Sequence, residues 1–211
     1  MPATLPNGFL IVFDGIDGVG KTTQLQAAET ALEAASWPTL ARRNLGGTPI
    51  GEELRQVMLR PVPRPPETDL YISVAIQAAL VEQVAKDRAA GQLILMDRGP
   101  ISLAAYQVYG SGLDQSLGWR HVDEGMANLK PDLTIVYTAD IATSIARARH
   151  QSAKTDYFEN KSLDYFERVA EGYQAAAERY DNIVTIEADG TIDAIHARTM
   201  ELIKKELAKL S

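Results

Sequence analysis

The sequence lacks several features that mark whole classes of protein. It has no cysteine, which excludes a disulfide framework, a thiol nucleophile and a cysteine zinc site. Its 3 histidines, His121, His150 and His196, are too scattered for a metal set or a catalytic triad, and we interpret them as structural or surface residues. Its apolar runs are short, since residues 9–13 are far too few to span a bilayer, and residues 1–8 carry no basic segment of the kind that opens a secretory signal. We therefore expect a cytoplasmic protein with no membrane partner.

The sequence also lacks an excess of positive charge. Lys and Arg total 21 against 28 Asp and Glu, which gives a net charge of −7. Because general nucleic-acid-binding proteins are normally basic, we expect no nucleic-acid partner, and any phosphate binding must come from a local site. The length of 211 residues predicts one domain over residues 1–211, large enough to bury a core without a metal or disulfide.

Short apolar runs alternate with amphipathic stretches along the chain. Strands are predicted at residues 9–13, 39–41, 93–96, 133–138 and 183–186. Helices are predicted at residues 21–35, 50–59, 69–90, 101–108, 119–129, 141–149, 162–180 and 192–210. The alternation predicts an α/β fold, a three-layer sandwich in which helices flank a mostly parallel five-stranded sheet. We interpret the proline-rich residues 60–66 as a stiff connection within the domain.

The sequence GIDGVGKT at residues 15–22 fits the pattern of a phosphate-binding loop. Its glycines let backbone N–H groups converge on phosphate oxygens, Lys21 can reach the β and γ phosphates, and Thr22 can place a hydroxyl on Mg²⁺. The loop follows an apolar strand and opens a helix, which predicts a fold of the P-loop NTPase type. The residues predicted to bind a nucleoside triphosphate are Gly15, Ile16, Asp17, Gly18, Val19, Gly20, Lys21, Thr22 and Thr23.

A carboxylate and a guanidinium, Asp97 and Arg98, follow another apolar strand. The carboxylate can hold Mg²⁺ through water, and the guanidinium can form a two-point contact with phosphate. The alternative is a simple surface ion pair. Because the phosphate-binding loop also follows a strand, and ligands of parallel sheets bind beyond the carboxyl ends of the strands, we favour the phosphate site.

Three cations, Arg147, Arg149 and Lys154, lie in a polar segment after the fourth predicted strand. They suit a lid over about residues 147–160 that closes on phosphate. Taken alone, the pattern favours a solvated helix face, and helical spacing places Arg147 and Arg149 on different faces.

Five segments together resemble the thymidylate kinases, a family of P-loop nucleoside monophosphate kinases. They occur in the family's order and with similar spacing, from about residue 9 to the C-terminus. They are residues 13–24 (FDGIDGVGKTTQ), 46–55 (GGTPIGEELR), 97–107 (DRGPISLAAYQ), 130–135 (KPDLTI) and 156–159 (DYFE). The resemblance implies ATP as the phosphoryl donor, Mg²⁺ as the cofactor and a homodimer built by packing helices.

The resemblance also implies a role for each matching residue. Lys21 would contact the ATP phosphates, and Thr22 and Asp97 would be the metal residues. Asp17 would contact the 3′-hydroxyl of the acceptor sugar, and Arg98 would grip the acceptor phosphate.

Further matches lie on the acceptor side. Arg55 and Ser102 match acceptor-binding positions, and Tyr106 matches a tyrosine that crowds the 2′ position and favours deoxyribose. Because residues 16–19 contain no arginine, the resemblance implies that the lid supplies the catalytic cation, from Arg147, Arg149 or Lys154. The predicted catalytic residues are Asp17, Lys21, Arg98 and Arg149.

Positions that would face the base depart from the family pattern. Asn44 and Leu45 replace a Glu-Pro pair. Ser73 and Gln77 stand where the family has a phenylalanine that stacks on thymine and an arginine that bonds it, and Leu103 replaces a polar residue. The loss of a stacking partner costs about 0.5–1.5 kcal/mol. Either another base is accepted, or thymine is held by other residues, or the register of this helix differs.

We expect transfer of the ATP γ-phosphoryl group to dTMP, giving dTDP. One alternative is the same chemistry on a different or modified deoxynucleoside monophosphate, because Ser73, Gln77 and Leu103 depart from the family. A second is a nucleotide-binding module without transfer activity. The transfer needs positioning and charge neutralisation but no nucleophilic side chain, because the acceptor phosphate is already an anion.

Overall fold

The computed structural model describes residues 5–151 and 161–210. Within this part of the chain, five strands form one sheet in the order β2-β3-β1-β4-β5, and every neighbouring pair is parallel. The strands are β1 (Phe9–Gly15), β2 (Thr39–Arg43), β3 (Leu93–Asp97), β4 (Leu133–Thr138) and β5 (Ile183–Glu187). The predicted α/β class and five-stranded sheet are confirmed, and the sheet is parallel throughout.

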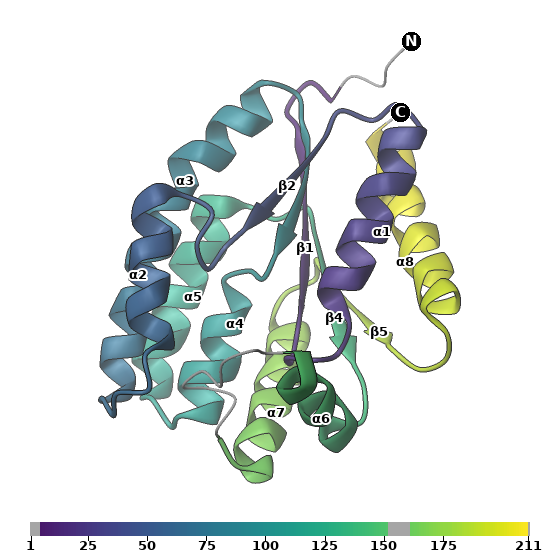
Figure 1. Cartoon of the computed structure of the whole chain (residues 1–211). Coiled ribbons are helices and arrows are strands. Elements are labelled where there is room, and N and C mark those ends of the chain that lie inside the picture. The colour runs from purple at the N-terminus through teal and green to yellow at the C-terminus, as the bar shows by residue number, and fades with distance from the viewer. Residues whose placement is uncertain (1–4, 152–160, 211) are drawn as a thin grey trace.

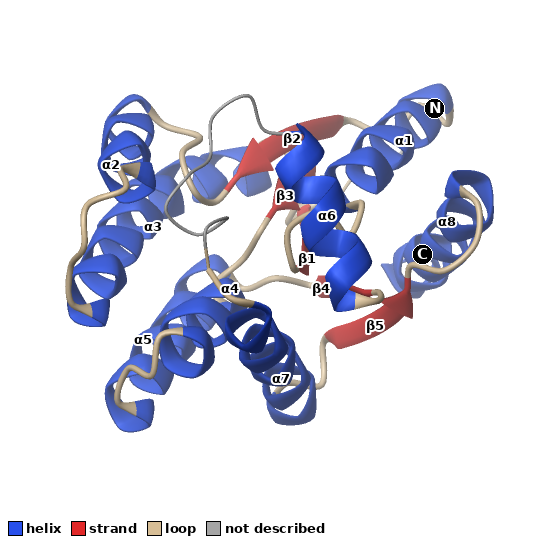
Figure 2. Ribbon diagram, turned by 60° about the horizontal axis from the view of Figure 1, so that its bottom comes forward, coloured by secondary structure: helices blue, strands red, loops and turns tan. Residues whose placement is uncertain are grey.

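Helices cover both faces of this sheet (Figure 1). Helices α1 (Lys21–Ala34) and α8 (Ile192–Leu207) lie on one face, and α8 continues into the short η2 (Ala208–Leu210). The other face carries α3 (Pro66–Ala89), α5 (Gln115–Leu129) and α7 (Leu163–Arg179), with α2 (Pro49–Leu59) outside α3 and the short α4 (Ile101–Leu103) and η1 (Ala104–Gly110) between α3 and α7. Helix α6 (Ile141–Gln151) crosses the carboxyl ends of the strands (Figure 2). No helix in the described ranges has the length and apolar character needed to cross a membrane.

The central strand β1 is buried on both sides. Leu10 and Val12 pack with residues of α3, while Ile11 and Phe13 pack in the cluster that contains residues of α1. All four side chains are fully buried, and each contributes about 1.5–3 kcal/mol of burial free energy. The short apolar run in the sequence is therefore a two-sided core strand.

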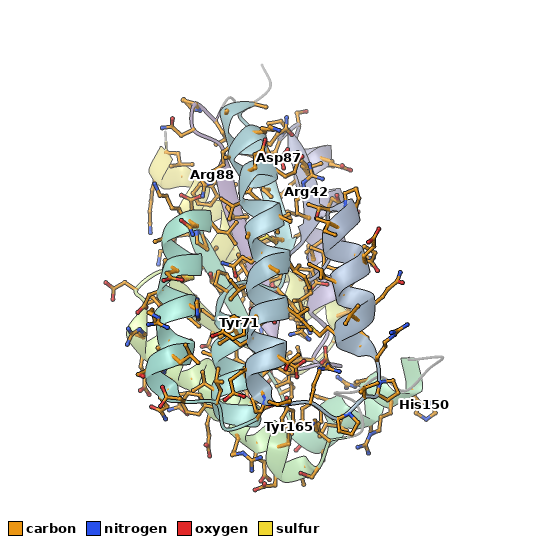
Figure 3. The ribbon with its side chains drawn as sticks, turned by 90° about the vertical axis from the view of Figure 1, so that its left-hand side faces the viewer. Arg42, Tyr71, Asp87, Arg88, His150 and Tyr165 are labelled. Carbon is orange, nitrogen blue, oxygen red and sulfur yellow. The ribbon has the colours of Figure 1, made fainter. Side chains whose placement is uncertain are left out.

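The edge strand β2 is tied to α3 by an ion pair (Figure 3). Arg42 donates from Nε and Nη2 to the two carboxylate oxygens of Asp87, at 2.8 and 3.0 Å. Gln83 donates to the same carboxylate at 3.0 Å. This arrangement fixes the end of α3 against a strand that has a neighbour on one side only.

Three helices differ from the sequence-based expectation. Helix α3 begins at Pro66, three residues early, because proline suits the first helical position. Helix α5 begins at Gln115, because the Asp114 side chain caps it by accepting from Leu117 N at 2.9 Å. The predicted helix at residues 101–108 is α-helical only over α4, and from Ala104 onward it is the π-helix η1, whose end is marked by Ser111 N donating to Tyr106 O at 3.0 Å.

Candidate active site

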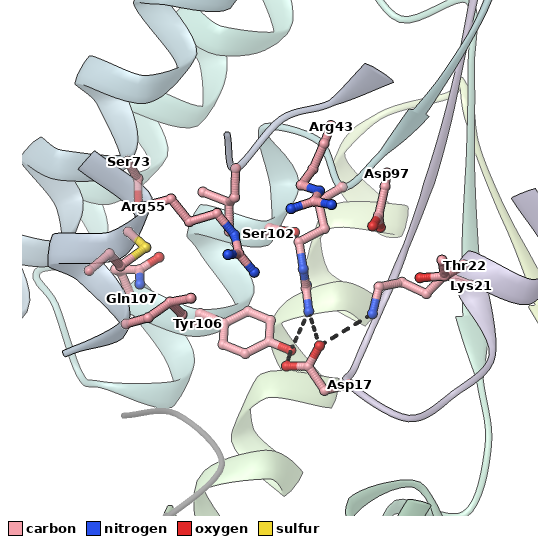
Figure 4. Close-up of a pocket in the computed structure, with 14 residues that line it drawn as sticks. Asp17, Lys21, Thr22, Arg43, Arg55, Ser73, Asp97, Ser102, Tyr106 and Gln107 are labelled. Atoms are coloured by element: carbon pink, nitrogen blue, oxygen red, sulfur yellow. Dashed lines mark hydrogen bonds and ion pairs between the residues drawn. The ribbon is translucent and has the colours of Figure 1, made fainter. Parts of the chain in front are cut away.

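A cavity of about 300 Å³ opens at the carboxyl ends of β1, β2 and β3 (Figure 4). It receives side chains from the β1–α1 loop, the start of α1, the end of β2 and the loop after it, α2, α3, the end of β3, α4 and η1. Its described lining residues are Asp17, Lys21, Thr22, Arg43, Leu45, Arg55, Met58, Leu59, Ser73, Asp97, Arg98, Ser102, Tyr106 and Gln107. The predicted phosphate-binding loop and the Asp97-Arg98 pair therefore meet in one pocket.

The β1–α1 loop has the close packing that its glycines allow. Gly18 has a φ of 77°, and a Cβ there would collide with the Ser144 carbonyl oxygen of α6. Lys21 opens α1 and folds back over the loop, donating from Nζ to Ile16 O at 3.1 Å. Burial, together with the nearby Arg98 charge, lowers the pKa of Lys21, against the opposing effect of Asp17. A bound phosphate would favour the charged lysine.

Asp17 is contacted by three donors, drawn as dashed lines in Figure 4. Arg98 Nη2 donates to it, Tyr106 OH donates at 2.9 Å, and Lys21 Nζ lies 3.4 Å away. Burial acts to raise the pKa of Asp17, but Arg98 and Lys21 outweigh it and hold that pKa well below the usual range. Asp17 is therefore a carboxylate that separates two cations.

Ser102 and Tyr106 are held by this network. The hydroxyl of Ser102 donates to Asp14 at 2.7 Å. The ring centroid of Tyr106 lies 5.0 Å from the guanidinium carbon of Arg98, which is a cation–π distance. Both residues line the cavity.

Asp97 and Thr22 fit a magnesium ion. Asp97 Oδ1 is buried and has no hydrogen-bond partner among the described residues, and both side chains line the cavity. Mg²⁺ prefers oxygen ligands and is usually held by one or two protein groups together with phosphates and water. Within the described residues no three His, Cys, Asp or Glu side chains gather around one point, so an all-protein cage is absent from that part of the chain.

Two more guanidinium groups reach into the pocket, as Figure 4 shows. Arg55, which the sequence indicated, lies 3.6 Å from Glu52. Arg43 was missed. It ends β2 directly beside Asp97 in the sheet register, yet its side chain pairs with no described residue. Its position after a strand was the signal that could have identified it.

The base-facing positions differ from the expectation. Ser73 lines the cavity, but Gln77 and Leu103 are not among its described lining residues. The amide of Gln77 lies instead against Gly125 of α5. Sequence reasoning missed Gln107, which carries the single carboxamide of the described lining. Its side chain makes no hydrogen bond with another described residue. The signal was its place in the matched segment, directly after Tyr106.

Two of the three predicted lid cations, Arg147 and Arg149, do not line this cavity. Arg147 and Arg149 are exposed on α6 and are absent from the described lining. Arg149 donates from Nη2 to Lys161 O at 3.3 Å. Lys154 and most of the predicted lid lie outside the described residues, so the assignment of a lid cation stays a prediction.

Comparisons with known proteins agree with this geometry. The family model described as thymidylate kinase matches residues 13–199. A thymidylate kinase of Nostoc punctiforme is 34% identical over 208 residues, covering 96% of this chain and 99% of the relative. One of Maridesulfovibrio salexigens is 36% identical, covering 92% and 96%. A crystal structure of thymidylate kinase from Ehrlichia chaffeensis has a TM-score of 0.75 at 22% identity, covering 94% of this chain and 100% of that one, which shows the shared fold. With the phosphate-binding loop and the Asp97-Arg98 pair in one pocket, these matches place the chain in the thymidylate kinase family.

Proposed function

We propose that this chain transfers the γ-phosphoryl group of ATP to dTMP and releases dTDP. One observation carries the proposal: Lys21 and Arg98 approach the Asp17 carboxylate together in a single pocket. The described lining holds four cations, Lys21, Arg43, Arg55 and Arg98, against two carboxylates, Asp17 and Asp97, which leaves the pocket short of negative charge. Two phosphate groups, one from each nucleotide, would supply it.

The residues divide into a donor side and an acceptor side. The loop from Gly15 to Thr23 holds the ATP phosphates. Within it, Lys21 begins α1 and its side chain folds back over the loop. Arg98, Arg55 and Arg43 bind the acceptor phosphate from the other side of the pocket. Such a site works by holding two anions in line and by excluding water, and it needs no general base.

The sugar and the metal use the remaining oxygen groups. Asp17, held ionised by its cations, accepts a hydrogen bond from the 3′-hydroxyl of the acceptor, and the ring of Tyr106 restricts the 2′ position. Thr22 and Asp97 would hold Mg²⁺, with the buried Oδ1 of Asp97, which has no partner among the described residues, as the carboxylate oxygen offered to it. Bound Mg²⁺ supplies charge neutralisation at the transferring phosphoryl group.

The base is bound by residues that replace the usual stacking partner. Leu45, Met58 and Leu59 give the cavity an apolar wall, and Ser73 leaves space beside them. Gln107 can accept from the N3–H of thymine and donate to its O4, because a carboxamide carries both functions. These residues favour thymine over the base of a different or modified deoxynucleoside monophosphate. The relatives reported above, which are named thymidylate kinases, support the same choice.

The test is a coupled assay over a panel of deoxynucleoside monophosphates at saturating MgATP. We expect the highest kcat/KM with dTMP. Lys21→Ala is the inactive control, with turnover lowered by orders of magnitude, and Lys86→Ala, which removes an exposed lysine on α3, is the matched control with normal turnover. If none of the acceptors in the panel is phosphorylated, the result would favour a nucleotide-binding module. A preference for another base would favour the modified-nucleotide alternative.

We propose further that the chain forms a homodimer and acts in the cytoplasm, where both nucleotides are available. Helices α2 and α3 expose Ile50, Val57 and Tyr71 at 52%, 46% and 56% of their surface, an apolar set suited to packing helices. Sedimentation velocity checks the dimer, and a monomer at micromolar concentration would contradict it. Cell fractionation checks the compartment.

A further inference from the structure

A buried tyrosine on α7 reaches the centre of the pocket from behind. Tyr173 is 2% exposed and does not line the cavity. Its hydroxyl donates to Asp14 Oδ1 at 2.7 Å and accepts from Arg98 Nη1 at 3.3 Å. A phenol has one proton, so the short contact with Asp14 takes it and the Arg98 contact uses a lone pair. Tyr173 thus connects a buried carboxylate to the guanidinium.

The carboxylate that it contacts is saturated with donors. Asp14 is 0% exposed and accepts from Gly15 N, Gly99 N and the Ser102 hydroxyl at 2.9, 2.9 and 2.7 Å. Burial raises the pKa of Asp14, and the Arg98 charge and the hydrogen bonds offset that rise only in part. Four donors around one carboxylate define its position closely.

The same carboxylate fixes the backbone at Arg98. Arg98 has a φ of 65°, a left-handed conformation that costs a residue with a Cβ free energy. Its own N–H donates to Phe13 O at 2.9 Å, and the next N–H, of Gly99, donates to Asp14. The turn is therefore held from β1 on both sides of Arg98, and its guanidinium nitrogen lies 3.7 Å from Asp14.

We propose that Tyr173 and Asp14 are positioning residues, which hold Arg98 in the orientation that binds the acceptor phosphate and never touch the acceptor. The inference rests on the proposed function of Arg98. The contacts of Arg98 Nη1 with Gly15 O, Ser102 and Tyr173 lie at 3.3–3.5 Å. Arg98 Nη2 is already paired with Asp17. Because the three contacts of Nη1 are long, the loss of the Tyr173 hydroxyl leaves Nη1 loosely held and lets the guanidinium swing about its Asp17 contact.

The first test is Tyr173→Phe, compared with Tyr137→Phe. Tyr137 is also buried, and its hydroxyl shares a hydrogen bond with Thr199 at 2.9 Å in the core. We expect Tyr173→Phe to raise the KM for dTMP about tenfold, as the loss of a hydrogen bond to a charged group does, with the KM for ATP unchanged. Tyr137→Phe should lower thermal stability without moving either KM. An unchanged dTMP KM in Tyr173→Phe would overturn the proposal.

A double-mutant cycle separates positioning from a structural effect. Arg98→Lys removes the guanidinium but keeps a charge, so adding Tyr173→Phe to it should change the dTMP KM by less than twofold. Full additivity would show that Tyr173 acts elsewhere. Asp14→Asn is a second test: it should also raise the KM for dTMP in the wild-type protein and change it by less than twofold in Arg98→Lys. If Asp14→Asn does not fold, the Tyr173→Phe cycle alone decides. Wild-type turnover of dTMP tests the proposed function, whereas the variant ratios test positioning.

Discussion

Asp17 separates two cations that would otherwise repel each other across the pocket. Lys21 lies 3.4 Å from it, and Arg98 pairs with it from the other side. Because the surroundings are partly desolvated, these attractions are stronger than they would be in water. A sugar hydroxyl brings only a dipole to Asp17, so both ion pairs can persist when the acceptor binds. The unmatched positive charge is left for phosphate.

Gln107→Leu should weaken acceptor binding selectively. We expect the KM for dTMP to rise by about tenfold or more, because the polar edge of thymine would be left without its hydrogen-bond partner. The KM for ATP should stay unchanged. Gln77→Leu is the matched control, because the Gln77 amide lies against Gly125 and outside the described lining of the cavity. Steady-state kinetics of both variants check this. A larger effect for Gln77→Leu would return the base contact to α3, where the sequence had placed it.

At the scale of elements, the buried strands were predictable and the helix starts were less so. An apolar run such as residues 9–13 marks a strand buried on both faces, and β1 contains it entirely. The first turns of α3 and α5 carry proline and polar residues, which show no apolar period. Their starts at Pro66 and Gln115 depend on proline geometry and on the Asp114 cap.

The π-helix η1 could not be predicted from periodicity. Its apolar pattern suits an α-helix equally well, and the wider turn arises where α7 packs closely. Gly172 of α7 lies against the Ala105 backbone, and Gly110 of η1 lies against Tyr165. Both contacts join residues far apart in the sequence. Tyr106 and Gln107 are presented to the cavity from this turn, and π-turns often occur at functional sites.

Most of the described lining of the pocket was predictable because its motifs are local. The loop that contains Lys21 and the pair Asp97-Arg98 each carry their chemistry within a few residues. Arg43 and Gln107 carry weaker signals, the position of Arg43 at the end of a strand and the place of Gln107 beside Tyr106. They enter the site because β2 pairs with β3 and because η1 turns toward α3. Both arrangements depend on tertiary structure and cannot be read from a local sequence pattern.

Gly18→Ala should cost more than its backbone strain. Gly18 has a φ of 77°, and a Cβ would collide with Ser144 O and crowd Ala148 N of α6. Gly112→Ala is the matched control, because Gly112 has a φ of 73° with open space around its Cβ position. We expect about 1–2 kcal/mol of lost stability from strain alone in the control, and a larger loss with weakened ATP binding in Gly18→Ala. Urea unfolding and ATP titration measure both, and equal losses would contradict the packing argument.

At the scale of the whole molecule, an acidic chain contains a basic pocket. The net charge is −7, yet the described lining of the cavity contains Lys21, Arg43, Arg55 and Arg98 against two carboxylates. The acidic surface disfavours polyanions, whereas the enclosed pocket admits small ones. The parallel sheet makes this possible, because it brings the ends of β1, β2 and β3 to one edge. The edge strand β2 is the outermost of these, and its attachment to α3 maintains that edge.

The Arg42–Asp87 pair should therefore give the fold a defined pH dependence. Burial raises the pKa of Asp87, but hydrogen bonds from Arg42 and Gln83 outweigh it and lower that pKa below its ordinary value. A carboxyl group with a lowered folded pKa stabilises the protein above its unfolded pKa of about 4, and this contribution is lost as the pH falls through the folded value. Asp87→Asn should cost about 1–2 kcal/mol at neutral pH, and the gap from wild type should close below about pH 4. Urea unfolding across that range measures it, with Asp189→Asn, which removes the exposed partner of Arg198, as a control of unchanged stability. A gap that stays constant into acid would mean that packing of α3 on β2, rather than this charge, secures the edge of the sheet.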